Sequence, residues 1–381
     1  MKIGLPFCLL VCFVTISSKV YGAQSEYLHQ PVISTRVMGM GGAFTAVADD
    51  YNALFYNVAG LGKLESGQLN MGIQGMMTPS ILSFKNDLEK AGSDAAAITS
   101  ALGNYYGAHF ASRVGLGAVW VRPTWGIAIM PIDLSVEADI HGTAGTTVGV
   151  QIYQDSLVQF GKAWFLNDKK TFNVGVAPKI VYRGYFEKDL SVFDLATSKD
   201  LLRPQDAQEG LTFDTDVGAL YSLDIPEDGF FKFFQIIKPT LGFAVRNVLD
   251  MGYKTNLHLM GKDSTIVTGA NLERRFDLGS RFDLPEFFVF KPRFMIDGRD
   301  MGSRYASFKK CLHVGAELLW KAFGWLNGGY RFGVSEGYLT AGVSAEIGIF
   351  NLDIATYSEE IGTKDAPKES RRYMAKLSLD F

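Results

Sequence analysis

Hydrophobic and polar positions alternate with period two along most of this chain. In residues 338–350 one parity is apolar and the other is small or polar, and residues 371–381 repeat the pattern. This periodicity is typical of a β-strand with one apolar face, because successive side chains point to opposite sides of a strand. We count about fourteen such segments, near 66–76, 107–121, 124–140, 155–166, 170–186, 211–224, 238–248, 264–277, 287–298, 308–321, 324–334, 338–349, 350–358 and 371–381.

The segments are long enough to cross a bilayer. A tilted spanning strand needs about 9 to 11 residues, whereas strands of soluble domains usually run nearer 5 or 6. Because hydrocarbon offers no partners to backbone groups, a sheet within it must close on itself. The sequence therefore predicts an all-β fold, a transmembrane antiparallel β-barrel of about 14 strands with a polar lumen. The inward parity carries charges of both signs: Lys179, Asp214, Asp216, Arg246, Lys291, Arg293, Glu317, Arg331, Glu346, Asp353, Lys376 and Asp380.

Connection lengths support this topology independently. Outer-membrane barrels alternate short periplasmic turns with longer external loops. Short connections are expected at 122–123, 167–169 and 322–323. Two connections depart from the alternation: 225–237 is too long and too aromatic for a simple turn, and 335–337 is too short for an external loop. The long connections lie around 77–106, 141–154, 187–210, 249–263, 299–307 and 359–370.

One helix is expected in the first long connection. Asn86 and Glu89 resemble a capping box, and the apolar residues that follow keep a three–four spacing. This pattern predicts a small helix packed over the barrel mouth, with a substrate-collecting surface as the alternative.

The N-terminal sequence and the composition limit where the protein is located and which partners it has. Residues 1–23 match a secretory signal, with Lys2 followed by the apolar run 5–16 and a small-residue cleavage region. The mature chain then keeps only Cys311, which excludes an intramolecular disulfide, and the net charge of −3 argues against a nucleic-acid partner. We divide the chain into a signal peptide at 1–23, an N-terminal hatch or plug segment at 24–64 and a barrel at 65–381.

Residues 37–61 are too rich in glycine and small side chains for a lipid-facing strand. Gly39, Gly41 and Gly42 permit positive φ and close backbone contact. The run is not a phosphate loop, because no Gly-Lys-Ser/Thr follows and Phe44 replaces the third glycine of the dinucleotide pattern. The pattern indicates a compact segment that approaches other backbone.

Residues 39–61, GMGGAFTAVADDYNALFYNVAGL, resemble the N-terminal segment of the outer-membrane long-chain fatty acid transporter (FadL) superfamily, which includes PorV-like and spirochaete FadL-like branches. The resemblance implies a fourteen-stranded barrel with this segment folded into the lumen as a hatch, and apolar ligands that leave sideways into the membrane. Val58 replaces the proline of the family's Asn-Pro-Ala motif, which restores a backbone N–H. The hatch or gate residues implied are Gly39, Gly41, Gly42, Phe44, Asp49, Asp50, Asn57, Val58 and Ala59.

Catalytic and metal sites find no support in the pattern. The five histidines are scattered and form no HExxH pair. The run 342–346 approaches a Gly-x-Ser-x-Gly elbow around Ser344, but it ends in Glu346 within an alternating strand. His313 could join Ser344 only by converging at one rim. We therefore predict no enzyme, no cofactor and no metal.

Two functions fit these observations. The first is a channel for uptake or passage of small hydrophobic molecules, with long-chain fatty acids favoured by the resemblance and the hatch as gate. The alternative is a PorV-like, non-transporting barrel that docks or shuttles for a secretion system and has secretion proteins as partners. Both imply the cell outer membrane and contact with its lipid, and neither assigns ligand-binding residues.

Overall fold

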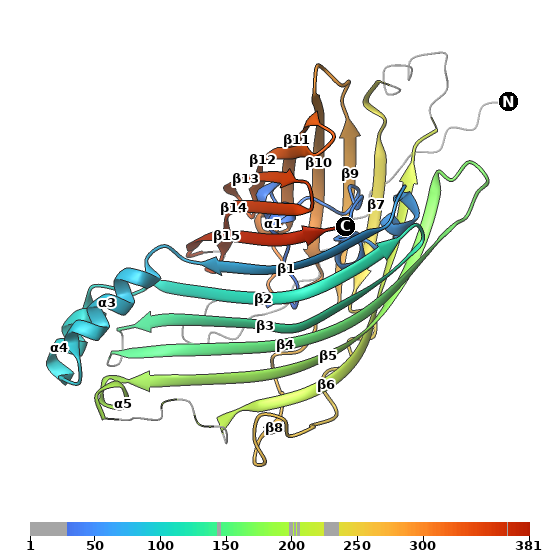
Figure 1. Ribbon diagram of the computed structural model, residues 1–381. Coiled ribbons are helices and arrows are strands. Elements are labelled where there is room, and N and C mark those ends of the chain that lie inside the picture. The colour runs from blue at the N-terminus through green and yellow to red at the C-terminus, as the bar shows by residue number, and fades with distance from the viewer. Residues whose placement is uncertain are drawn as a thin grey trace.

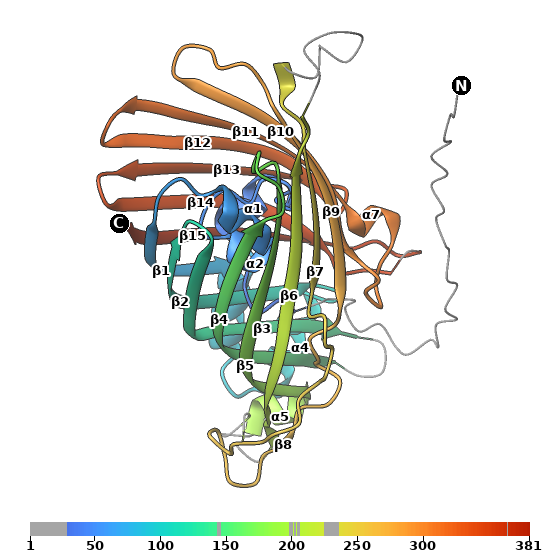
Figure 2. The same cartoon turned by 90° about the vertical axis from the view of Figure 1, so that its right-hand side faces the viewer.

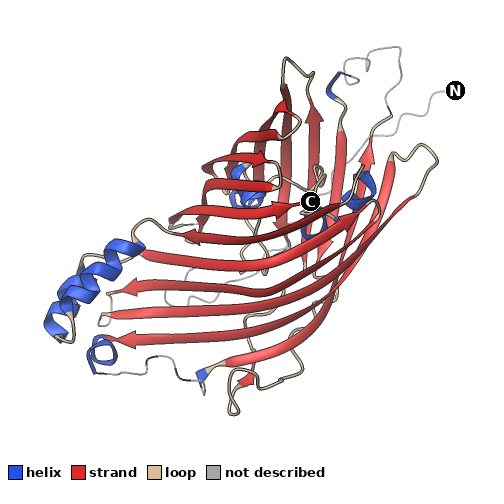
Figure 3. Cartoon of the chain, viewed as in Figure 1, coloured by secondary structure: helices blue, strands red, loops and turns tan. Residues whose placement is uncertain are grey.

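The computed structural model describes residues 29–142, 146–197, 201, 203, 206–224, 236–363 and 365–381, so the expected signal peptide lies outside the described residues. In these ranges 15 strands form one sheet, and all but the two-residue β8 (Thr265–Ile266) close into an antiparallel barrel of 14 strands (Figures 1 and 3). Pairing of β1 with β15 and of β5 with β6 closes the wall. Its strands are β1 (Gln68–Met77), β2 (His109–Arg122), β3 (Trp125–His141), β4 (Thr147–Phe165), β5 (Phe172–Ser191), β6 (Gln208–Ser222), β7 (Thr240–Arg246), β9 (Arg275–Asp283), β10 (Phe290–Met301), β11 (Leu312–Phe323), β12 (Leu326–Ser335), β13 (Tyr338–Ile347), β14 (Phe350–Glu360) and β15 (Glu369–Asp380).

The predicted barrel is confirmed, with two corrections to its strands. The predicted strand at 264–277 is wrong, because the wall strand there is β9, while β8 pairs in parallel with the start of β6. Apolar residues before β9, such as Ile266 of β8, carry the same period and blur the boundary. The connection predicted at 141–154 is also wrong, since β3 and β4 leave only residues 142–146 between them.

The outer surface of the wall is apolar. On β13, Leu339 and Val343 are 73% and 40% exposed, and on β15, Tyr373 and Leu377 are 51% and 54% exposed. A closed sheet with an apolar exterior satisfies its backbone groups internally and suits hydrocarbon, so the barrel is of the membrane-spanning kind. Lys291 shares the inward parity of Arg293 but is exposed near the strand end, where it pairs with Glu286 at 2.9 Å.

The two ends of the barrel differ. At the turn end, short connections such as 123–124 and 324–325 join the strands, and Leu69 and Phe381 exchange backbone hydrogen bonds of 2.9 and 3.0 Å. The loop end carries most of the longer connections. The exceptions are the two-residue turn at 336–337, where φ is +55° and +85°, and the long connection from β6 to β7 at the turn end, of which residues 223–224 and 236–239 are described. Helices at the loop end are α3 (Ile81–Ala91), α4 (Ala95–Gly103), α5 (Val192–Thr197) and α7 (Phe308–Cys311) (Figures 1 and 2).

The first long connection contains two helices where one was predicted. Asn86 lies within α3, so the capping box is wrong. Gly92, at φ +60°, ends α3, and the Asp94 side chain accepts the Ala96 N–H at 3.2 Å to begin α4. Ile98 of α4 is buried against β2 to β5 at the barrel mouth. In the part of the chain that the structure describes, no helix is long and apolar enough to span a bilayer.

Candidate functional site

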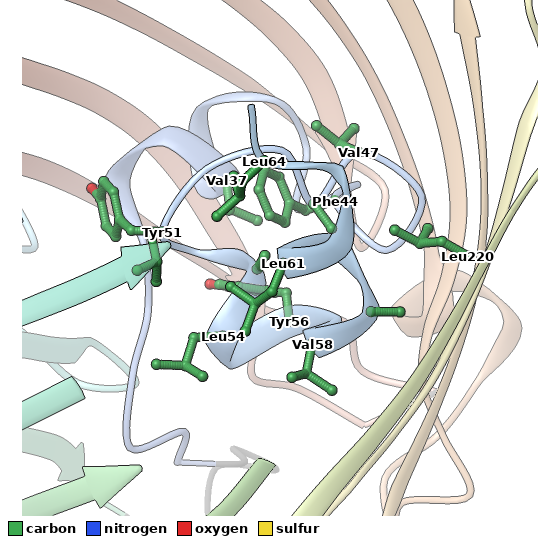
Figure 4. Close-up of a cluster of buried hydrophobic side chains, with 14 of the residues drawn as sticks. Val37, Phe44, Val47, Tyr51, Leu54, Tyr56, Val58, Leu61, Leu64 and Leu220 are labelled. Carbon is green, nitrogen blue, oxygen red and sulfur yellow. The ribbon is translucent and has the colours of Figure 1, made fainter. Parts of the chain in front are cut away.

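Residues 29–67, here called the N-terminal segment, lie inside the barrel (Figures 1 and 2). The segment forms α1 (Thr35–Gly39), α2 (Ala53–Tyr56) and the 3₁₀ helix η1 (Val58–Lys63). Its apolar side chains form a core with inward side chains of the wall, among them Leu220 (Figure 4). Phe44 packs edge-on against Tyr56, with ring centroids 5.5 Å apart. The segment therefore folds against the wall within the lumen.

Wall glycines let the backbone of the segment approach the strands closely. A Cβ atom on Gly242 would lie 2.3 Å from the Thr45 carbonyl oxygen, and one on Gly315 would lie 2.3 Å from that of Met40. These separations are far below van der Waals contact, so a larger residue would displace the backbone. The glycines that touch the segment, here called the glycine belt, run from β4 to β13: Gly161, Gly175, Gly218, Gly242, Gly279, Gly315, Gly333 and Gly342.

The predicted hatch glycines meet this belt. Gly39 approaches Gly342, where a Cβ on Gly39 would lie 3.1 Å from the Gly342 Cα. Gly41 and Gly42 have φ of +71° and +79°, a region that side chains with a Cβ disfavour. A Cβ on Gly41 would also lie 2.2 Å from the Val314 carbonyl oxygen. Both conformation and space thus require glycine at position 41.

Wall side chains bind the backbone just after these glycines. The carboxylate of Asp297 on β10 accepts the N–H groups of Phe44 and Thr45 at 2.8 and 2.7 Å. His313 Nδ1 and Arg299 Nη1 donate to the carbonyl oxygens of the two positive-φ glycines, each at 2.7 Å. These bonds satisfy backbone groups that would otherwise be buried without partners.

Arg36 of α1 is the centre of a buried charge cluster. Its guanidinium lies 3.0 Å from Asp49, 2.6 Å from Asp50 and 3.0 Å from Glu317 on β11. Arg293 on β10 pairs with Asp49 at 2.5 Å and also with Glu317. Burial alone would raise the pKa of Asp49, but the Arg293 and Arg36 charges outweigh it and lower this pKa to about 2. Asp49 is therefore ionised at neutral pH and ties the segment to the wall.

Inward wall charges that the parity predicted continue this cluster. Arg331 donates to Glu317 at 2.7 Å, to Asp353 at 3.1 Å and to the Ser344 hydroxyl at 2.9 Å. Ser344 and His313, weighed above as an esterase-like pair, thus hold separate partners. Among the described residues, no group of three or more His, Cys, Asp or Glu is placed to hold a metal ion.

Asn57 organises the start of η1. Its Oδ1 accepts the Ala59 N–H at 3.2 Å, and its Nδ2 donates to the carbonyl of Ala219 on β6 at 3.1 Å. Val58 is 2% exposed and its side chain lies against two glycines of the belt. At this position, packing against the wall takes the place of the fixed backbone that a proline would supply.

Sequence reasoning missed Arg36 and Asp297. Arg36 lies three residues before the motif, and its signal is an isolated charge beside an apolar, glycine-rich run, since a buried charge needs a partner. Asp297 shares the inward parity of Arg293, so the alternation already placed it in the lumen.

A cavity lies on the side of the lumen away from the glycine belt. Tyr51 and Phe55 line it from the N-terminal segment, and Gly72, Gly117 and Met130 line it from β1, β2 and β3. This lumen cavity thus borders a part of the wall where two neighbouring strands carry glycine.

An apolar hollow lies on the outer face of the same strands. It is lined by outward side chains such as Leu116, Ile129 and Leu377, and also by Gly72 and Gly117. These two glycines are register partners across β1 and β2. Because they have no side chains, the wall itself is only backbone at these two positions, and the Met130 side chain covers Gly117 on the lumen side.

β3 carries a β-bulge beside this thin wall. Its register with β2 shifts between Leu116 and Ala118, and its register with β4 shifts between Met130 and Asp133. Pro131, inside the bulge, has no N–H to donate to the ladder. The pairing of β2 with β3 is therefore interrupted next to Gly117.

Comparison with known proteins gives structural likenesses at low identity. No protein-family model matches the sequence, and no curated protein matches it. The toluene transporter TbuX of Ralstonia pickettii matches with 10% identity and a TM-score of 0.47, covering 92% of this chain and 98% of that one. The toluene transporter TodX of Pseudomonas putida gives 10% and 0.46, with 94% and 99% covered. A FadL homologue of Pseudomonas aeruginosa gives 9% and 0.42, with 91% and 97% covered. The family that the N-terminal motif resembles is thus represented among the matching structures.

Proposed function

We propose that this protein is an outer-membrane channel through which small hydrophobic molecules pass, with the N-terminal segment as its gate. The observation that carries the proposal is the thin wall at Gly72 and Gly117, which borders the lumen cavity on one side and the outer hollow on the other. At these two positions the wall between the cavity and lipid is backbone, covered on the lumen side by the side chains of Met130 and Lys376.

The two ends of the barrel give the path a direction. Short turns face the periplasm in outer-membrane barrels, so the loop end lies outside the cell. Molecules enter at the loop end, and the N-terminal segment closes the straight path to the turn end. Contacts with the glycine belt and the Arg36 cluster hold the segment there. The remaining route is sideways, through the interrupted pairing of β2 and β3.

Long-chain fatty acids are one proposed class of cargo. Lys376 lines the lumen cavity, where its ammonium donates to the Tyr51 hydroxyl at 2.7 Å and to the Asn70 side chain at 2.6 Å. A buried ammonium suits a carboxylate head group, while the apolar outer hollow suits an acyl chain. The similar structures include a toluene transporter and a monoaromatic hydrocarbon channel, so uncharged aromatic molecules are a second class to test.

Uptake of N-phenylnaphthylamine by intact Gram-negative cells tests the proposal, because this dye fluoresces once it reaches phospholipid. Cells that make the protein should brighten faster than cells that do not. The variant Gly117→Leu should lose the gain, because a side chain there meets Met130, whereas Gly75→Leu points into open space and should keep it. Equal rates with and without the protein would refute the channel.

A lipid extract of the purified protein separates the channel from the docking alternative. Acyl chains or aromatic molecules at about one per barrel would support passage. A protein partner that co-purifies in equal amount, with no such molecule bound, would support docking to a secretion system instead.

A further inference from the structure

We infer that the side chain of Met130 is the movable cover of the thin wall and sets the size of the molecules that leave through it. This inference rests on the proposed function and assigns one residue to the selectivity of the sideways route.

Met130 lies directly over Gly117 on the lumen side. A Cβ atom on Gly117 would stand 2.1 Å from the Met130 sulfur and 2.7 Å from its terminal methyl carbon. The thioether therefore occupies the space that a side chain at position 117 would take. Gly72, its partner on β1, is flanked by the stem of Lys376, whose Cε would lie 3.0 Å from a Cβ there. Met130 is thus the apolar part of the inner cover.

The packing of Met130 allows it to move. It is only partly buried, and it lies between two buried clusters, one built on the N-terminal segment and one around Tyr153 and Tyr185. An unbranched thioether has three rotatable bonds and adapts to irregular spaces. Rotation of this side chain breaks no hydrogen bond, whereas shifting the N-terminal segment separates Arg36 from Glu317.

Because of the β-bulge, Met130 lies where the backbone pairing between β2 and β3 is interrupted. Met130 immediately precedes Pro131, and the register of β3 with β2 skips Gly117. When the Met130 side chain swings away, the lumen cavity reaches the glycine backbone and the outer hollow beyond it without a further side chain between them. The volume of the residue at position 130 then limits what fits.

The test compares two dyes of different size in intact Gram-negative cells, N-phenylnaphthylamine as the smaller and Nile red as the larger. Met130→Ala should raise the ratio of Nile red to N-phenylnaphthylamine uptake by about fivefold, and Met130→Trp should lower uptake of both by about fivefold or more, since pocket size alone discriminates on this scale. Met295→Ala is the matched control, because Met295 is a fully buried inward methionine of β10 beside the glycine belt. It should leave the ratio unchanged.

The outcomes distinguish failure of Met130 as the size filter from failure of the proposed channel function. If the wild-type protein takes up neither dye, the proposed function fails. If the wild type takes up dye but the ratio for Met130→Ala equals that for Met295→Ala, Met130 is not the size filter. Heat-modifiable mobility on gels verifies that each barrel has folded. If Met130→Trp fails that check, Met130→Phe replaces it, and a rate equal to wild type would overturn the inference in the same way.

Discussion

Arg36 of the N-terminal segment and Glu317 of β11 form a two-pronged ion pair, with Nε and Nη2 at 3.1 and 3.0 Å from the two carboxylate oxygens. The Glu317 side chain is fully buried and that of Arg36 is 12% exposed. A buried charge depends on its partner, because little water can solvate it if the partner is removed. The pair therefore couples the position of the segment to the wall.

Replacing Arg36 by methionine should remove this coupling. Arg36→Met leaves Asp49, Asp50 and Glu317 short of one cation, and loss of a buried partner typically costs about 3 to 5 kcal/mol. Denaturant titration of the protein folded in liposomes measures the free energy of unfolding. The control Arg122→Met removes an exposed arginine at the turn end and should cost under about 0.5 kcal/mol. Similar costs for the two variants would show that the cluster contributes no net stability.

The glycine belt makes a second prediction. Gly242→Ala places a Cβ 2.3 Å from the Thr45 carbonyl oxygen, so the segment must shift. We expect a loss of about 1 to 3 kcal/mol in the free energy of unfolding. A Cβ on Gly75 of β1 meets no heavy atom within 4 Å, so Gly75→Ala should change stability by less than about 0.5 kcal/mol. A harmless Gly242→Ala would mean that the segment does not lie against β7.

Depth in the membrane gives a third prediction. Val343 lies at the middle of the outward face of β13, whereas Leu339 lies at its loop end. An outward arginine costs about 2 to 4 kcal/mol at the bilayer midplane and about 0 to 1 kcal/mol near the interface. Val343→Arg should therefore destabilise the barrel in liposomes more than Leu339→Arg does. The reverse order would contradict the placement of the strand in the membrane.

The turn at 336–337 gives a prediction for pH. Glu336 accepts the Glu360 N–H at 2.6 Å, and burial, followed by repulsion from Glu359, raises the pKa of Glu336 to about 8. The unfolded chain ionises this group near its ordinary pKa of 4.5, so the folded state loses stability as pH rises from there toward 8.

Glu336→Gln keeps the acceptor and removes the charge. It should raise the free energy of unfolding at pH 9 by roughly 2 kcal/mol and leave it nearly unchanged at pH 4. Denaturant titrations of both proteins at the two pH values measure the difference. A gain at pH 4 that matches the gain at pH 9 would argue against a buried, protonated carboxyl.

The barrel itself could be predicted because every outward position in lipid must be apolar. Apolar side chains therefore recur at every second residue of each strand, as at Leu339 and Val343. The strand boundary at β9 was missed because residues before it, such as Ile266 of the short β8, continue the period. The bulge in β3 also escaped the prediction, since one extra residue at Pro131 resets the alternation and looks like a brief irregularity within one long strand.

The internal contacts of the lumen could be predicted only in part. Parity placed Arg293 and Glu317 inside, but their pairing with Arg36 depends on strand register and on how the segment folds across the lumen. The glycine belt could not be predicted from the sequence for a different reason. Glycine fits either face of an alternating strand, so nothing in the sequence distinguishes Gly242, where a Cβ would clash with Thr45, from Gly75, where a Cβ would meet no heavy atom within 4 Å.

We propose that residues 39–61 close the lumen of a wall that folds without them. The test is the conductance of single proteins in planar bilayers, with the full mature chain compared with a chain lacking 39–61. The shortened chain should keep its heat-modifiable mobility on gels and conduct small ions through a steadily open pore, while the full chain should conduct little. A shortened chain that folds and conducts no more than the full chain, or one that cannot form the barrel at all, would refute this proposal.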